Sequence, residues 1–296
     1  QEGPRQDWFA SPHVMIAFGI ACVTLFVFVR IQLRADVPFV DFRPLAIPSY
    51  AIGIVLALIT GIGFTGTSLI VPLYMQDVLK YAPDMAGYIM VPAAVGAIIG
   101  TEVSGRIAKW IPASILAAIS LVLCAVGTWW FAYLGARIGF DAAVLPRFVQ
   151  GIGLGLLYVP LNVLMMAHMP KKFIDAASGL SGVTRQIGAG FGFAILSSLI
   201  VRSRIAATSL TASRFRHATL CDDPGFAGLR RWFVAHGYSS ADASSLSLTM
   251  LQELVARAAT SAAYAETFVI VALLFVFSLP FLVLFHLARP READPA

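Results

Sequence analysis

The sequence predicts an all-α membrane protein. Of its 296 residues, 58% are hydrophobic and only 12% are charged, with a mean hydropathy of +0.81, whereas soluble domains are roughly 45–50% apolar and about 25% charged. The apolar residues gather in seven long stretches separated by polar connections. In lipid only helices and closed barrels satisfy every backbone polar group, and these stretches lack the two-residue alternation of barrel strands. Each stretch is therefore predicted to be a helix.

Seven membrane-spanning helices are expected, each long enough to cross a hydrocarbon core of about 30 Å. In chain order they cover residues 12–30, 48–74, 85–104, 113–134, 143–169, 176–202 and 265–288. The chain opens with Gln1 rather than Met, and its first residues lack the basic and apolar segments of a signal peptide. We expect the chain to be part of a longer protein.

Positive charge in the short connections predicts the orientation. Nine cations lie in connections on one side: Arg30, Arg34, Arg43, Arg106, Lys109, Lys171, Lys172, Arg289 and Arg291. Three lie on the other side: Arg5, Lys80 and Arg137. By the positive-inside rule, the first group and the C-terminus are expected in the cytoplasm, and the long polar stretch 203–264 is expected outside.

That external stretch is expected to have two parts. Residues 203–238 show no clear periodicity and are predicted to be irregular. After Ser239 and Ser240, which are residue types that cap helices, apolar residues recur at three- and four-residue steps. These are Leu248, Leu251, Val255, Ala258 and Ala262, while Glu253 and Arg257 are expected to point elsewhere. An amphipathic helix over 239–262 is predicted to lead into the last span, either lying on the rim of the bundle or contacting a partner protein.

Two spans carry an arginine on a face of small and polar residues. In the span 143–169 that face contains Arg147, Gly151, Gly155, Tyr158 and Asn162, with Gln150 nearby. In the span 176–202 it contains Ser178, Ser181, Gly182, Arg185, Ala189 and Gly192, followed at neighbouring positions by Gln186, Gly188 and Gly190. Helix packing accounts for the glycines, because small residues let helices approach closely.

Packing does not account for the two arginines. An ionised guanidinium facing lipid costs at least about 2.5 kcal/mol, so Arg147 and Arg185 are expected to face other helices or a watery cavity. A functional pathway is favoured over a purely structural ion pair. No acidic residue lies deep in any span, so the counter-charges are expected either from span ends such as Glu102, Asp77 and Glu266 or from a part of the protein outside this chain.

Enzymatic function is not expected. The five histidines are spread along the chain, and Cys22, Cys124 and Cys221 have no metal-ligand or disulfide spacing. The Gly-x-Gly-x-Gly runs at 151 and 188 lie inside apolar spans rather than after a strand, so they are not nucleotide loops. The net charge of +5 is scattered between spans, which is typical of membrane orientation rather than nucleic-acid binding.

The run Arg147-Phe-Val-Gln-Gly-Ile-Gly-Leu-Gly resembles the R-x-x-Q-G-x-G-x-G pattern in the fourth helix of each half of the major facilitator superfamily. Further resemblance to fourteen-helix drug:proton antiporters of the EmrB/QacA type comes from short motifs. These are Asp7-Trp-Phe-Ala-Ser, Pro72-Leu-Tyr-Met-Gln, Ala177-Ser-Gly-Leu-Ser-Gly-Val-Thr-Arg-Gln-Ile-Gly-Ala-Gly-Phe-Gly and Ala263-Tyr-Ala-Glu-Thr-Phe.

The resemblance implies two regions and a function. Residues 1–47 would hold the second of two central linker helices and a cytoplasmic connection, and residues 48–296 the C-terminal six-helix half. The N-terminal half, with the family's intramembrane acidic residue, would lie outside this chain. The whole would be a proton-driven exporter of amphipathic or aromatic compounds in the bacterial inner membrane, needing no cofactor and contacting a periplasmic adaptor of the membrane-fusion type through the 239–262 helix.

The site residues implied by this function are Arg147, Gln150, Tyr158, Asn162, Arg185 and Gln186 for the substrate and proton pathway, with Phe191 and Phe193 lining an apolar surface. Gly105, Arg106 and Lys109 resemble the family's cytoplasmic gating loop, although Trp110, Ile111 and Pro112 replace the charged residues often seen there. Two alternatives stay open: a major-facilitator transporter of a defined metabolite, and a seven-helix sensor or scaffold without transport.

Overall fold

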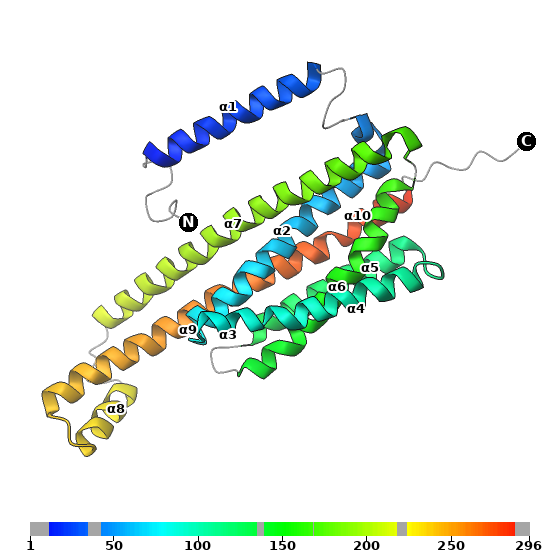
Figure 1. The fold of residues 1–296 in the computed structure, drawn as a ribbon. Coiled ribbons are helices and arrows are strands. Elements are labelled where there is room, and N and C mark those ends of the chain that lie inside the picture. Colours follow the sequence, from blue (N-terminus) through cyan, green and yellow to red (C-terminus); the bar gives the residue numbers. More distant parts are fainter. Residues whose placement is uncertain (1–11, 35–42, 135–138, 168, 218–223, 288–296) are drawn as a thin grey trace, which may run out of the picture.

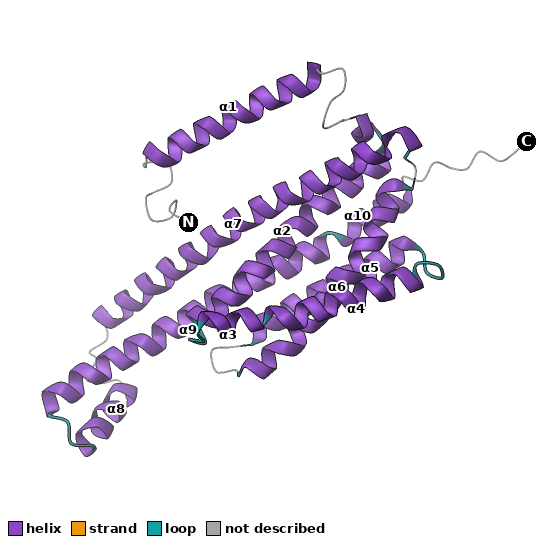
Figure 2. Ribbon diagram, viewed as in Figure 1, coloured by secondary structure: helices purple, strands orange, loops and turns teal. Residues whose placement is uncertain are grey.

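The computed structural model describes residues 12–34, 43–134, 139–167, 169–217 and 224–287. Helices are the regular elements throughout these ranges, joined by short loops (Figure 2), and the all-α prediction is confirmed. The motif at residues 7–11, Arg137, and the C-terminal Arg289 and Arg291 lie outside the described residues.

The elements follow the predicted order (Figure 1). They are α1 (Pro12–Arg34), η2 (Arg43–Ala46), α2 (Pro48–Asp77), α3 (Pro83–Tyr88), α4 (Met90–Ile107), α5 (Ala113–Tyr133), α6 (Phe140–Met166), η3 (Lys171–Phe173), α7 (Ile174–His217), α8 (Pro224–Ala235), α9 (Ser240–Phe277) and α10 (Leu279–Leu287). Six helical segments among the described residues are long and apolar enough to cross a membrane, and each overlaps one of the last six predicted spans. The first predicted span is α1, a helix of 23 residues that stands apart from the others in Figure 1.

Two of the predicted spans are each divided into two helices, and proline explains both breaks. Proline has no amide hydrogen, and its ring conflicts with the carbonyl four residues earlier. Pro92 lies four residues after Tyr88, where α3 ends. Pro280 lies four residues after Val276, and α9 ends at the next residue. The hydroxyl of Ser278 at the second break donates to the carbonyl oxygen of Leu274 at 2.9 Å.

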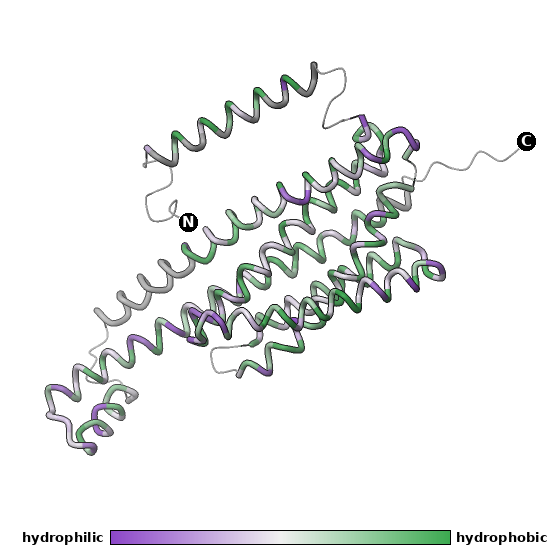
Figure 3. Tube along the Cα trace, in the orientation of Figure 1, coloured by the Kyte–Doolittle hydropathy of each residue, from purple (hydrophilic) through white to green (hydrophobic). Residues whose placement is uncertain are grey.

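Two groups of helices form the bundle. In one, α4 and α5 pack on α6; in the other, α2 packs on α7, and α9 joins the groups by packing on α5, α7 and α2. Most of the helices are largely apolar, with hydrophilic positions near their ends, within α7, and along α8 and the first half of α9 (Figure 3).

Glycine permits the closest helix contacts. A Cβ atom on Gly151 of α6 would collide with the carbonyl oxygen of Ala93 in α4, and one on Gly188 of α7 would collide with that of Leu58 in α2. A Cβ on Gly190 would meet nothing within 4 Å. The packing interpretation of the α7 glycines is therefore confirmed for Gly188 and Gly192, which also faces α2, but the described residues give no such reason for Gly190.

The prediction of an irregular segment over residues 203–238 is wrong. Helix α7 continues to His217, and α8 covers Pro224–Ala235. Residues 203–217 contain neither glycine nor proline, the two residue types that most disfavour a helix, so the helix can continue through them. A proline at the first position of α8 fits the start of a helix.

The predicted amphipathic helix is confirmed as the first part of α9, which runs without interruption into the last span. Ser239 caps it, because its Oγ accepts the amide hydrogen of Asp242 at 3.1 Å. The predicted face is partly wrong: Ala258 and Ala262 are exposed, whereas Arg257 is half-buried and its Nε donates to the carbonyl oxygen of Val78 at 2.6 Å. The C-terminal carbonyls of α2 need donors, and they attract the guanidinium inward.

Candidate functional site

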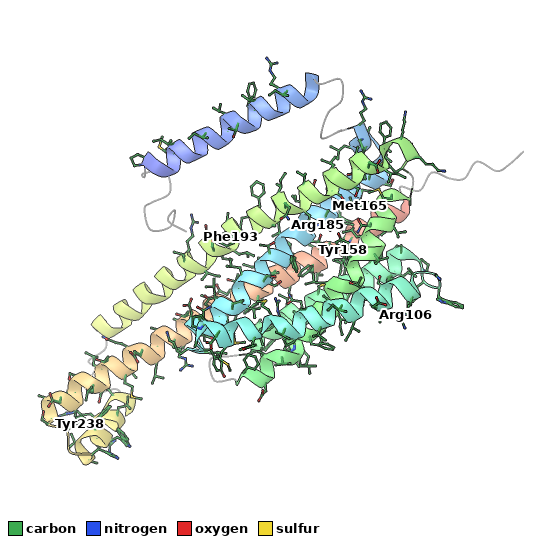
Figure 4. The ribbon with its side chains drawn as sticks, in the orientation of Figure 1. Arg106, Tyr158, Met165, Arg185, Phe193 and Tyr238 are labelled. Atoms are coloured by element: carbon green, nitrogen blue, oxygen red, sulfur yellow. The ribbon has the colours of Figure 1, made fainter. Side chains whose placement is uncertain are left out.

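A cavity of about 460 Å³ lies between α2, α4, α6 and α7. Its walls combine apolar and polar side chains: Phe64 and Thr60 come from α2, Tyr158 from α6, and Arg185 and Gln186 from α7. Figure 4 shows Arg185 and Tyr158 close to each other in the middle of the bundle. The sequence placed Tyr158, Arg185 and Gln186 in one pathway, and the structure brings these three together.

Arg185 and Tyr158 form the central contact of the cavity. The Cζ atom of Arg185 lies 4.9 Å from the centroid of the Tyr158 ring. A guanidinium over an aromatic face at this distance is attracted by the ring quadrupole. Of the described residues that line the cavity, Arg185 alone is charged, and no described carboxylate forms an ion pair with it.

Asn162, the fourth predicted pathway residue in this part of α6, does not line the cavity. Its Nδ2 donates to the carbonyl oxygen of Tyr158, one turn earlier, at 2.7 Å. The amide is therefore partly occupied by the backbone of its own helix. Phe191 is exposed and Phe193 is half-buried on α7, and neither belongs to the cavity wall.

Arg147 and Gln150 lie elsewhere, buried between α4, α5 and α6. Arg147 is 2% exposed and Gln150 is 0% exposed. The Nη1 atom of Arg147 donates to the Gln150 Oε1, and its Nη2 lies 2.9 Å from the Sδ of Met90. Gln150 in turn donates from Nε2 to the Oγ1 of Thr128 at 2.8 Å. Arg147 thus faces other helices, one of the two surroundings expected for it.

No described carboxylate lies within ion-pair distance of Arg147, and its Nε is buried without a hydrogen-bond partner among the described residues. Met90 and Thr128 in this network, and Thr60 and Phe64 in the cavity, were not predicted from the sequence. Threonines inside apolar spans were the available signal for two of these residues. Phe64 and Met90 could not be distinguished from lipid-facing or core residues.

The last turn of α4 and the loop that follows it carry the predicted gating residues. Arg106 and Glu102 form an exposed pair, with Nη2 and Oε2 3.6 Å apart at one-turn spacing on α4. Lys109 is exposed, and Trp110 is 86% exposed. A Cβ on Gly105 would meet no atom within 4 Å. The loop therefore presents its cations and its tryptophan outward from this bundle.

The residues that the structure describes do not bring three His, Cys, Asp or Glu side chains together as a metal site requires.

Comparison with known proteins identifies relatives of the chain. The family model described as Major Facilitator Superfamily matches residues 7–193. The chain is 26% identical to the Multidrug export protein EmrB of Escherichia coli (strain K12) over 198 residues, which cover 67% of this chain and 39% of that protein. It is 28% identical to the Fatty acid resistance protein FarB of Neisseria gonorrhoeae over 200 residues, covering 67% of this chain and 39% of that protein.

A third relative is the Tetracycline resistance determinant of Streptomyces rimosus, 28% identical over 233 residues that cover 77% of this chain and 66% of that protein. The matched part of the chain spans less than half the length of EmrB and FarB.

Proposed function

Because the chain belongs to the major facilitator superfamily, we propose that it is the C-terminal half of a proton-coupled multidrug exporter that works by alternating access. The observation that carries this proposal is the cavity between α2, α4, α6 and α7, which combines apolar walls with Arg185, Gln186 and Tyr158. Substrate sites of such transporters lie near the bilayer midplane between two halves. An open, mixed surface at the middle of one half fits that arrangement.

Residues of the cavity would bind the substrate directly. Apolar side chains such as Phe64 and Leu161 would contact the hydrophobic part of a compound, and Gln186 would form hydrogen bonds. A guanidinium that stays charged also favours the ionised form of any carboxylate facing it from the other half, which would link substrate binding to proton binding. The names of the relatives point to several substrate classes, namely drugs, fatty acids and tetracycline.

The same proposal places the protein in the bacterial inner membrane with its C-terminus in the cytoplasm. The excess of cations in the short connections on one side of the predicted spans, nine against three, supports this orientation. The helices α8 and α9 would then project into the periplasm, where an adaptor of the membrane-fusion type would contact them.

Transport by the protein expressed from its full reading frame tests the proposal. The protein would be reconstituted into proteoliposomes with an imposed pH gradient, and a fluorescent pH indicator would report proton movement when an amphipathic drug is added. We expect drug-dependent collapse of the gradient. Drug movement that does not depend on the pH gradient would contradict antiport. Proton movement that occurs with a single polar metabolite but with none of the drugs would contradict multidrug transport.

A further inference from the structure

Resting on the proposed function of the cavity, we infer that its substrates are anionic amphipathic compounds and that Arg185 binds their carboxylate. The structure places one cation, one aromatic ring and a set of apolar walls around the same space. The cation would bind the carboxylate of such a compound, and the aromatic ring and apolar walls would contact its hydrophobic body.

The charge of the cavity wall indicates the charge of the ligand. Arg185 is the charged residue among the described residues of the wall, and no described carboxylate neutralises it. A cation in a partly apolar cavity attracts anions more strongly than the same cation in water, since the effective dielectric constant is lower. It repels cationic compounds for the same reason. On the side of the cavity that this chain forms, the sign of the field therefore favours an anionic ligand.

The position of the Arg185 guanidinium indicates that it can bind a carboxylate. The Cζ atom of Arg185 lies over the Tyr158 ring, 4.9 Å from the ring centroid. No described residue accepts a hydrogen bond from the guanidinium N–H groups. A carboxylate matches the paired N–H groups of an arginine in a bidentate arrangement. Arg185 is thus oriented and still has donors for a ligand.

The apolar walls of the cavity indicate that the rest of the ligand is hydrophobic. Phe64 is 52% exposed, and it lines the cavity together with Leu154, Leu161 and Ala189. The hydroxyl of Thr60 donates to the carbonyl oxygen of Ala57 at 3.0 Å, so it does not need to donate a hydrogen bond to a ligand. A volume of about 460 Å³ lies within the usual range for drug-sized ligands. A compound with one anionic end and an apolar body satisfies both parts of the surface.

Arg147 does not offer the same site. It is 2% exposed, its Nη1 is occupied by Gln150, and it does not line the cavity. The two intramembrane arginines therefore have different surroundings, and the anion site is assigned to Arg185 alone.

Equilibrium binding of two matched ligands tests the assignment. The ligands are 11-(dansylamino)undecanoate and its primary amide, which share the same body and differ in charge. Binding to the full-length protein in lipid nanodiscs is followed by dansyl fluorescence, with empty nanodiscs as the blank. We expect the wild-type protein to bind the acid at least about tenfold more tightly than the amide, because charge-assisted hydrogen bonds are stronger than neutral ones.

Substitutions test whether Arg185 causes the preference for the acid over the amide. Arg185→Gln should weaken binding of the acid by about 10- to 100-fold and change binding of the amide by less than about twofold. Arg185→Lys should give an intermediate loss, since lysine restores charge without the planar fork. Tyr158→Phe keeps the ring and should retain the preference for the acid, whereas Tyr158→Leu should reduce it. Arg202→Gln, the same change at an exposed position of α7 outside the cavity, is the control.

The outcomes separate this inference from the proposed exporter. Equal affinity for acid and amide in the wild type, or an equal loss of both in Arg185→Gln, would overturn the anion site. Retained amide binding shows that each variant is folded. Selective acid binding through Arg185 without proton-linked transport of either compound would uphold the anion site and overturn the exporter.

Discussion

Lys80 is a non-glycine residue with a left-handed backbone, with a φ of 61° in the turn after α2. This conformation costs an L-residue about 1–2 kcal/mol relative to a right-handed one, whereas glycine adopts it freely. The Lys80 side chain is exposed. We expect Lys80→Gly to stabilise the protein by about 0.5–1 kcal/mol, because relief of strain exceeds the added entropy of the unfolded chain.

Thermal unfolding in detergent measures this effect. Gly237 is the matched control, since it has a φ of 91° with open space around it, and Gly237→Ala should destabilise the protein. A lower melting temperature for Lys80→Gly would show that the added entropy of the unfolded chain outweighs the relief of backbone strain.

The buried network around Arg147 gives a prediction at the same scale. Gln150→Leu would leave the Arg147 Nη1 without its acceptor in a buried site, at a cost of about 1–3 kcal/mol or more. Adding Arg147→Met removes the unpartnered charge, so the double variant should be more stable than Gln150→Leu alone. Thr128 stays satisfied in both, because its hydroxyl already donates to the Cys124 carbonyl at 2.8 Å.

A double-mutant cycle of unfolding midpoints, with proton-linked export measured in parallel, checks this prediction. A stable double variant without export would support a role of Arg147 in coupling. If the double variant is less stable than Gln150→Leu, the arginine contributes to the fold itself.

The sequence predicted that both arginines avoid lipid, but it could not assign them to different neighbours. Arg147 and Tyr158 lie on one face of α6 by periodicity, yet Arg147 faces α4 and α5 while Tyr158 faces α2 and α7. Helices cross at an angle, so the neighbour of a given face changes along a long helix. Periodicity gives the face of a residue and carries no information about the helix that covers it.

At the scale of elements, close approach of α2 and α7 depends on glycine at particular positions. Gly188→Ala would place a methyl group against the carbonyl oxygen of Leu58, which belongs to backbone and cannot rotate away. We expect a loss of about 1–3 kcal/mol, typical of overpacking. Gly190→Ala, on the same helix, meets nothing within 4 Å and should gain up to about 1 kcal/mol of helix propensity.

Melting temperatures of the two variants, purified in the same detergent, provide the comparison. Equal destabilisation by both would mean that glycine is needed in α7 for flexibility rather than for contact with α2.

Element type and most span boundaries were predictable, because apolar length and composition decide them. The differences between the predicted and the observed helices have local causes. Two spans are divided near Pro92 and Pro280, whereas Pro72, Pro146 and Pro160 lie inside unbroken helices, so the presence of proline does not by itself predict where a span divides. The helical character of residues 203–217 was missed because a polar helix has no apolar period to detect.

Cation placement predicts an orientation of the molecule in the membrane, and this orientation can be tested. In a background without native cysteines, Lys172→Cys and Ser245→Cys would place thiols at two exposed positions on opposite ends of the bundle. An impermeant maleimide added outside intact cells or spheroplasts should label the Ser245 position only. Labelling of the Lys172 position alone would reverse the topology.

Two helices extend far beyond the length that a bilayer requires. Helix α7 has 44 residues and α9 has 38, which correspond to about 66 Å and about 57 Å, against a hydrocarbon core of about 30 Å. Their extra lengths lie at the same end of the molecule, where α8 packs on α9 and the three helices project beyond the others (Figure 1).

The surface of this projection is apolar in several places. Trp232 is 54% exposed and Tyr238 49% exposed at the α8 end, and on α9 Met250 is 44% exposed and Leu254 49% exposed. Exposed aromatic and aliphatic side chains of this kind are typical of protein contact sites. They support the proposal that an adaptor protein contacts the projection.

Replacing residues 224–250 by a short Gly-Ser linker tests the role of the projection. The replacement spares Arg257, whose Nε donates to the Val78 carbonyl and joins α9 to the end of α2, so the bundle should fold. We expect drug resistance of cells to be lost, because compounds would no longer pass to an adaptor, while proton-linked transport by the reconstituted protein persists. The paired change Trp232→Ser and Tyr238→Ser should reproduce the loss without a deletion, and Arg257→Gln should instead lower stability and both activities together. If the linker variant loses reconstituted transport to the same extent as resistance, the projection supports the transporter itself rather than a partner.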